Sequence, residues 1–164
     1  MPSANLVAAL RQAQEAAATL KLRQARDKAQ GRTAGWYEAR PTEQRYCGLQ
    51  NEGATCYLNS LLQALYHLPE VRKAVYAFHY EGEAVHGNKE LCVPLQLAAL
   101  FARLQISTCQ AASTRALTAS FGWSRAESFR QHDVQELCRV LFTALSKFGV
   151  GIESDLFEGN LTST

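Results

Sequence analysis

The sequence predicts a mainly α-helical protein. Several segments carry apolar residues three or four positions apart, which is the spacing that places them on one face of a helix. Prolines and glycines separate these segments, as expected between short helices. Hydrophobic residues make up 47% of the 164 residues, which is enough for a globular core. A chain of this length forms one domain or part of a larger one.

Residues 1–44 differ from the rest and form a first unit, a helix followed by a linker. No Gly or Pro occurs over 4–30, and one set of residues follows the a/d spacing of a coiled-coil seam: Leu6, Leu10, Ala13, Ala17 and Leu20. This spacing lasts barely two heptads. A solitary helix, a short coiled coil or partner-binding helix, and a mitochondrial transit peptide therefore all stay open for 4–30. Residues 31–41 are expected to be the linker.

Residues 45–164 form the second unit, and its elements can be justified in order. The expected elements are a leucine-rich helix over 57–68, a helix over 70–78 after Pro69, a polar loop over 81–89, a helix opened by Pro94, and a short helix over 113–121. A longer helix then carries an apolar stripe from Val134 to Phe148. It can begin at either of two capping boxes, Ser124 with Glu127 or Ser128 with Gln131. Gly149 and Gly151 end it, and 152–161 begins a strand.

Composition and charge argue against several classes of protein. No apolar run is long enough to span a membrane. The net charge of +2 is too small to favour a nucleic-acid partner. The five cysteines contain no C-x-x-C pair, so a zinc site is not expected. No secretory signal is visible, and reduced thiols in the cytosol or nucleus are the natural interpretation.

One cysteine stands where a polar, glycine-containing turn is expected to become the leucine-rich helix. Free N–H groups and the dipole at a helix N-terminus stabilise a thiolate, which is the form that attacks a carbonyl, so the position of Cys56 suits a nucleophile. Asn51 lies in the turn, and its amide can donate to an oxyanion. Gly53 permits the close approach of a substrate backbone. The alternatives are a buried, inert thiol at Cys56 and a purely turn-forming role for Asn51.

The residues around Cys56 resemble the Cys box of the ubiquitin-specific proteases, a family of deubiquitinating cysteine proteases. Family-typical residues occupy every defining position of the box in GLQNEGATCYLNSLLQ, over 48–63. Further along, QHDVQEL over 131–137 resembles the second box of the family. The segments RKAVY, over 72–76, and SFGW, over 120–123, look most like the herpesvirus-associated ubiquitin-specific protease and its close relatives. The resemblance covers about 45–161.

The resemblance implies a fold and a role for each matching residue. Residues 45–164 would be the helical thumb subdomain of a papain-like cysteine protease, which is α+β when complete. Cys56 would be the nucleophile and Asn51 the oxyanion-hole donor in cleavage after the C-terminal Gly of ubiquitin, through a thioester and with a His as base. The residues that would line the channel for the ubiquitin tail are Gln131, His132, Asp133 and Gln135, with Trp123 as a possible wall. No cofactor or metal is expected for this chain, and the resemblance implies ubiquitin and ubiquitinated proteins as its partners.

The chain also departs from the family pattern. The downstream catalytic His box and the zinc-binding C-x-x-C pairs of the family do not occur in these 164 residues. His132 belongs to the second box, while His67, His79 and His86 match no family position. We therefore expect the chain to be inactive alone, as a fragment, a truncated gene product or a short product of a longer gene. Two functions stay open: the nucleophile-bearing part of a deubiquitinase, and a non-catalytic interaction protein of the ubiquitin pathway.

Overall fold

The computed structural model describes residues 11, 43, 45–52, 55–122, 134–152 and 157. These residues contain, in chain order, β1 (Gly48–Leu49), α2 (Cys56–His67), α3 (Pro69–Ala77), α4 (Glu83–His86), α5 (Val93–Ile106), β2 (Ala111–Ala112), α6 (Arg115–Ser120) and α7 (Val134–Ser146). The prediction of a mainly α-helical fold is confirmed.

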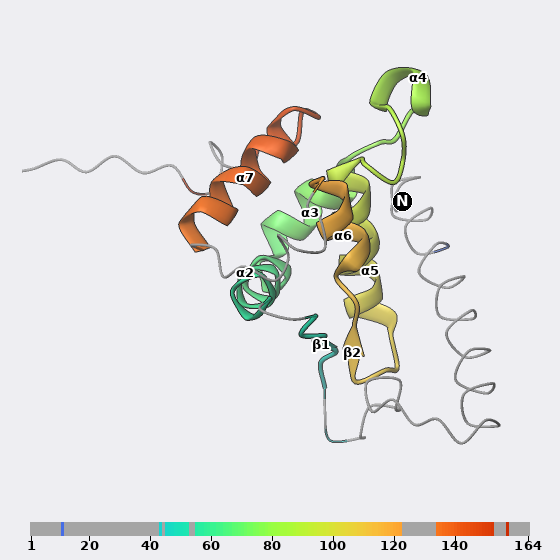
Figure 1. Cartoon of the computed structure of the whole chain (residues 1–164). Coiled ribbons are helices and arrows are strands. Elements are labelled where there is room, and N and C mark those ends of the chain that lie inside the picture. The colour runs from blue at the N-terminus through green and yellow to red at the C-terminus, as the bar shows by residue number, and fades with distance from the viewer. Residues whose placement is uncertain are drawn as a thin grey trace, which may run out of the picture.

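Helix α5 is the centre of the arrangement. It packs against α3, α6 and α7, and α2 packs against α3 and α7. Figure 1 shows α6 beside α5, with the two short strands at one end of this pair and α4 on a loop at the other end. β1 and β2 pair in parallel, with Gly48 opposite Ala111 and Leu49 opposite Ala112. α2 and α7, which are the first and last helices that the structure describes in 45–164, are thus in contact with each other.

The core is formed by the apolar faces that the sequence predicts. The largest fully buried side chains include Leu58, Leu62, Leu97, Leu100, Phe101, Leu117, Leu137, Leu141 and Leu145. They come from α2, α5, α6 and α7 and belong to one cluster. Because α2 contributes leucines to this shared core, its axis and its first residue are fixed by packing against α3 and α7.

Local sequence explains where individual helices begin and end. Leu68 is extended between α2 and α3, because a residue before a proline is disfavoured in the helical region, and Pro69 then opens α3. Past the end of α7, Gly149 has a φ of +75°, which a residue with a side chain rarely adopts. The N–H of Val150 donates to Leu145 O at 3.1 Å, and that of Gly149 to Ser146 O at 2.9 Å. This is the Schellman pattern that satisfies the last carbonyls of a helix.

The structure corrects two sequence-based expectations. The segment 81–89, expected to be a loop, contains the single-turn helix α4, whose backbone turns at Gly82 and Gly87 with positive φ values. The pairing of β1 with β2 was not expected, because strands of two residues leave no alternating pattern in the sequence.

Other expectations fall on residues that are not described. The N-terminal helix over 4–30 lies outside the described residues, apart from residue 11. Both proposed starts of the last helix and nearly all of the strand expected over 152–161 lie outside them too. α7 is described from Val134 onward, and Ile152 is buried at 1% exposure.

In the part of the chain that the structure describes, no helix combines the length and the apolar character needed to cross a bilayer.

Candidate active site

Cys56 is the first residue of α2 and its side chain is exposed. The next two residues, Tyr57 and Leu58, are buried at 8% and 0% exposure, so packing holds the start of the helix in place. The first N–H groups of a helix have no partner within it, and the helix dipole adds partial positive charge there. The first turn contains no acidic residue to offset that charge. The thiol is therefore exposed at the positive end of the helix dipole.

The remaining four cysteines have different surroundings. Cys47, Cys92 and Cys109 are buried, and Cys138 is half-buried. Burial raises the pKa of the Cys92 thiol. All five cysteines lie within the described residues, and among them Cys56 alone is exposed. The alternative of a buried thiol at Cys56 is therefore wrong, and its role as a nucleophile stays a prediction.

The amide of Asn51 is oriented by Thr55. The backbone N–H of Thr55 and its hydroxyl both donate to Asn51 Oδ1, at 3.3 and 3.2 Å. A backbone N–H can only donate, so the atom facing it must be the amide oxygen. The Asn51 NH₂ group then points away from Thr55, on an exposed side chain. Asn51 thus bonds within its own turn, as the alternative reading expected, and still presents two donors.

Thr55 is the hub of this turn. Its side chain is 1% exposed, and its hydroxyl oxygen accepts the N–H of Glu52 at 3.0 Å while donating to Asn51. In the sequence, Thr55 is recognisable only as a family-typical residue of the box. The structure shows that it joins the cysteine position to the asparagine position, because it immediately precedes Cys56 and bonds Asn51.

Two amides on α2 hold the segment before the turn. Asn59 Nδ2 donates to Gln50 O at 2.9 Å, and Gln63 Nε2 donates to Cys47 O at 3.1 Å. Asn59 and Gln63 lie four positions apart on the helix, so they share one face. Two family-typical polar residues of the box thereby act as anchors of the chain that leads into the turn.

Pairing of β1 with β2 also holds this segment. Gly48 N donates to Gln110 O at 2.7 Å, and Gln50 N donates to Ala112 O at 2.9 Å. A Cβ at Gly48 would lie 3.2 Å from Gln110 O, so a side chain there would push the strands apart. The glycine of the box is explained by this close approach.

The second predicted group of site residues is described only in part. Gln131, His132, Asp133 and Trp123 lie outside the described residues, as does Gly53 of the first box. Gln135 is described and exposed in the first turn of α7. Since α7 packs against α2, the fold brings the two boxes to neighbouring helices. The role of these residues in a tail channel stays a prediction.

None of the described histidines forms a pair with Cys56. His67 is the last residue of α2, about 16 Å along the axis from Cys56 at 1.5 Å per residue, and it packs edge-on against Tyr46 and Tyr66. His86 lies in α4, where its Nδ1 accepts the N–H of Glu81 at 3.0 Å. His79 is exposed in the segment between α3 and α4. The described histidines are therefore occupied elsewhere or far along the helix from the thiol.

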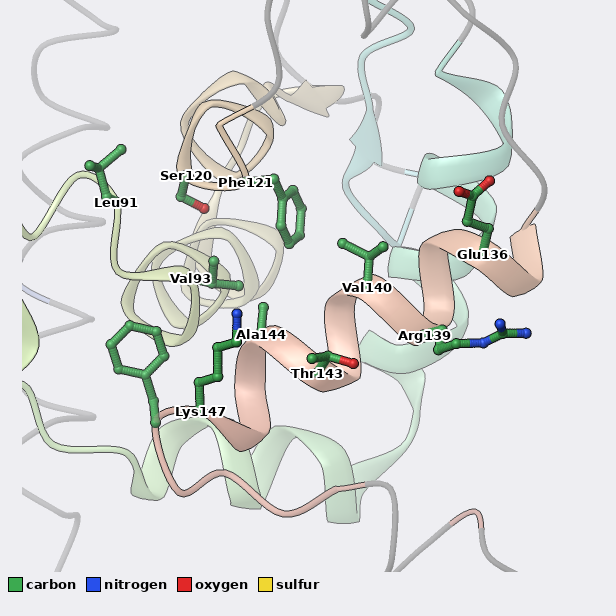
Figure 2. Close-up of a pocket in the computed structure, with 11 residues that line it drawn as sticks. Leu91, Val93, Ser120, Phe121, Glu136, Arg139, Val140, Thr143, Ala144 and Lys147 are labelled. Carbon is green, nitrogen blue, oxygen red and sulfur yellow. The ribbon is translucent and has the colours of Figure 1, made fainter.

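A groove of about 570 Å³ lies between α7, the start of α5 and the end of α6. Figure 2 shows Val140 and Ala144 of α7 on the side that faces Phe121 and Val93. Charged side chains also line this groove, namely Glu136, Arg139 and Lys147. Neither Cys56 nor Asn51 lines it, so the groove does not surround the thiol.

Comparison with known proteins identifies the family. The helical scaffold presents an exposed thiol at the start of α2, after a turn in which Thr55 orients the amide of Asn51. The family model of ubiquitin carboxyl-terminal hydrolase matches residues 47–164. The chain therefore belongs to the ubiquitin carboxyl-terminal hydrolase family, and its assignment to the ubiquitin-specific proteases is confirmed.

Three relatives illustrate the match. The chain is 46% identical over 121 residues to ubiquitin carboxyl-terminal hydrolase 47 of Drosophila melanogaster, covering 71% of the chain and 8% of that protein. It is 43% identical over 125 residues to the Homo sapiens protein of the same name, covering 73% and 9%. It is 48% identical over 110 residues to ubiquitin carboxyl-terminal hydrolase 40 of Homo sapiens, covering 63% and 9%. The chain thus spans less than a tenth of the length of these relatives, and the particular likeness to the herpesvirus-associated enzyme stays a prediction.

Proposed function

We propose that this chain supplies the nucleophile and an oxyanion donor of a thiol-dependent deubiquitinase. The observation that carries the proposal is the exposed Cys56 at the first position of α2, next to an Asn51 amide that Thr55 orients. Both residues lie within the part of the chain that the family model covers. The substrate class is ubiquitin joined through its C-terminal Gly to an amine.

The chemistry proposed for Cys56 is acyl transfer. Its thiolate attacks the carbonyl carbon of the last Gly of ubiquitin, and the carbonyl oxygen becomes an oxyanion. The bond to the amine breaks, the amine takes a proton from the general acid, and a thioester remains on Cys56. Water then attacks the thioester, releases the ubiquitin carboxylate and restores the thiol.

Asn51 is proposed to stabilise the oxyanion. Its amide oxygen is held by two donors from Thr55, so its NH₂ group is directed before substrate arrives. A preorganised donor needs no rearrangement when the charge develops, and losing one such donor costs roughly 10²–10³-fold in rate in other acyl-transfer enzymes. Gln131, His132, Asp133 and Gln135 are proposed to hold the extended ubiquitin tail, whose glycines offer mainly backbone groups to polar side chains.

The general base is proposed to be a His outside these 164 residues. His67 lies at the far end of α2, and His86 accepts a backbone N–H within its own loop. The isolated chain should therefore release no aminomethylcoumarin from ubiquitin-aminomethylcoumarin. Release that Cys56→Ala abolishes would show that the chain contains its own base.

The five free thiols support a location in the cytosol or nucleus.

Binding of a ubiquitin C-terminal aldehyde tests the proposed roles directly. Addition of Cys56 to the aldehyde places an oxygen where the oxyanion would form, and it needs no leaving group. Cys56→Ala should abolish the aldehyde-dependent part of the affinity, and Asn51→Ala should weaken that part about 100-fold. Ubiquitin with its ordinary carboxylate gives the non-covalent affinity as the control. If both variants bind the aldehyde like the unaltered chain, the non-catalytic interaction protein becomes the better reading.

A further inference from the structure

The carboxylate of Glu52 joins the Asn51 turn to a distant part of the fold. Ser113 Oγ donates to Glu52 Oε1, and Arg115 Nε pairs with Glu52 Oε2. The Glu52 side chain is 10% exposed, whereas that of Arg115 is 72% exposed. A carboxylate that is nearly buried between two donors is fixed in direction, while its cationic partner reaches it from the surface.

The two partners of Glu52 are themselves fixed in place. They belong to the segment that follows β2 and begins α6, and Ser113 Oγ also accepts the backbone N–H of Arg115 at 3.3 Å. β2 in turn pairs with β1, which leads into the turn. We call Glu52, Ser113 and Arg115 the Glu52 clamp. The strand pairing attaches the segment before the turn to β2, and the clamp attaches the turn itself to the start of α6.

The clamp reaches Asn51 through Thr55. The backbone N–H of Glu52 donates to Thr55 Oγ1, and this bond occupies an acceptor position on the hydroxyl. The single hydrogen of the hydroxyl is then directed at Asn51 Oδ1. If Glu52 moved away from α6, its N–H would leave Thr55, and the hydroxyl would be free to rotate away from Asn51. The direction of the Asn51 NH₂ group would then no longer be set.

We infer that Glu52 is a positioning residue, which holds the oxyanion donor Asn51 through Thr55 and is itself held by Ser113 and Arg115. Glu52 occupies one of the positions of the box that the family pattern leaves open. The inference rests on the proposed function, because it assigns Asn51 the donor role. Glu52 itself touches neither the thiol nor the reacting carbonyl in this account.

The first test is a double-mutant cycle on the full chain, read by anisotropy of dye-labelled ubiquitin aldehyde. Glu52→Ala should weaken the aldehyde-dependent affinity about 10-fold, and in the Asn51→Ala background it should have no further effect. Arg115→Ala should weaken it as well, and Arg115→Lys should restore part of the loss because the positive charge remains. Glu90→Ala, which removes an exposed carboxylate in a turn before α5, is the matched control and should change nothing.

The rate of Cys56 alkylation by iodoacetamide separates positioning from a general structural effect. This reaction forms no oxyanion, so Glu52→Ala should leave its rate within about twofold, because the thiol itself is unchanged. A loss of both aldehyde affinity and alkylation rate would mean that the variant disturbs α2 as a whole and would overturn the inference.

Amide hydrogen exchange tests the same link without ubiquitin. In Glu52→Ala, exchange of the Thr55 N–H should rise about 10-fold, while that of Leu62 in the middle of α2 should stay unchanged. An unchanged Thr55 rate, or additive effects of Glu52→Ala and Asn51→Ala, would overturn the inference. If Asn51→Ala leaves aldehyde binding intact, the proposed donor role fails, and this outcome is distinct from a failure of Glu52 alone.

Discussion

Thr55 is 1% exposed, and it makes three of the hydrogen bonds that shape the turn before Cys56. Its partners in these bonds are Asn51, the proposed oxyanion donor, and Glu52, the central residue of the clamp. The sequence predicts the roles of Cys56 and Asn51, because a cysteine at a helix start suits a nucleophile and an amide in the turn before it can donate to an oxyanion. It does not disclose the clamp, because Ser113 and Arg115 lie 61 and 63 residues from Glu52 and no short-range pattern links them.

Replacing Thr55 by Val tests the hub at nearly constant shape. The variant loses both the acceptor of the Glu52 N–H and a donor to Asn51. Its free energy of unfolding should fall by about 1–3 kcal/mol, which is typical of a polar group left without its partner. Urea denaturation measures this, with Thr143→Val on the exposed side of α7 as the control. Equal stability of the two variants would contradict the role of Thr55.

The five thiols should react with iodoacetamide in the order of their exposure. Cys56 should be alkylated first and Cys138 more slowly, while Cys47, Cys92 and Cys109 should react only after unfolding. Cys92 should be especially slow, because its thiol is inaccessible to the reagent and burial also raises its pKa, which lowers the thiolate fraction. Peptide mapping of a time course measures the order, and Cys56→Ser should remove the fast phase. Labelling of Cys92 as fast as Cys56 would contradict the structure.

α2 and α7 were anticipated from their leucine patterns, and the structure gives α2 nearly the expected limits. α2 spans Cys56–His67 where 57–68 was expected, which places the cysteine inside the helix as its first residue. Helical periodicity fixes which side chains face the core, but it does not set the terminal residue to better than a turn. α4 was missed because a single turn is too short to show periodicity. β1 and β2 were missed because their pairing depends on contacts between distant residues.

Neighbouring positions on α7 should differ sharply in their contribution to stability. Leu141 is 0% exposed and Val140 is 39% exposed. Leu141→Ala should therefore lower the free energy of unfolding by about 2–5 kcal/mol, as removal of a buried leucine leaves a cavity. Val140→Ala serves as the control and should cost far less. Urea denaturation of the two variants measures the difference, and similar losses would mean that the face of α7 is assigned wrongly.

Tyr76 links α3 to α5 and makes stability depend on alkaline pH. Its hydroxyl donates to Gln105 Oε1 at 3.2 Å, and its pKa is raised to about 12, first by burial and then by the nearby Tyr66. The folded state therefore keeps this proton above pH 10, where an unfolded tyrosine loses it. Titration of Tyr76 should leave the free energy of unfolding unchanged well below pH 10 and should lower it as the pH rises from 10 towards 12.

The control for this pH dependence is Tyr76→Phe. Thermal melting between pH 9 and 11 should show a smaller loss of stability in the variant than in the unaltered chain. Parallel losses in both proteins would exclude Tyr76 as the source of the alkaline sensitivity.

In the molecule as a whole, the helix that begins with the thiol packs against the helix that carries the described end of the second motif. α2 carries the thiol and α7 begins within the second motif, and both helices bury leucines in the same cluster. Membership of the ubiquitin carboxyl-terminal hydrolase family was predictable from the sequence, because the first box is long and its residues are chemically specific. The roles of Gln131, His132 and Asp133 depend on residues outside the described part of the chain, and they stay predictions.

The most direct test of the central claim is to identify the residue that ubiquitin modifies. Ubiquitin carrying a C-terminal vinyl methyl ester should form a single adduct with the full chain, because a thiolate adds to this group without a leaving group or a second protein residue. Peptide mapping should place the adduct on Cys56, with its formation lost in Cys56→Ala and retained in Cys138→Ala. An adduct on any other cysteine, or one that persists in Cys56→Ala, would contradict the assignment of Cys56 as the nucleophile.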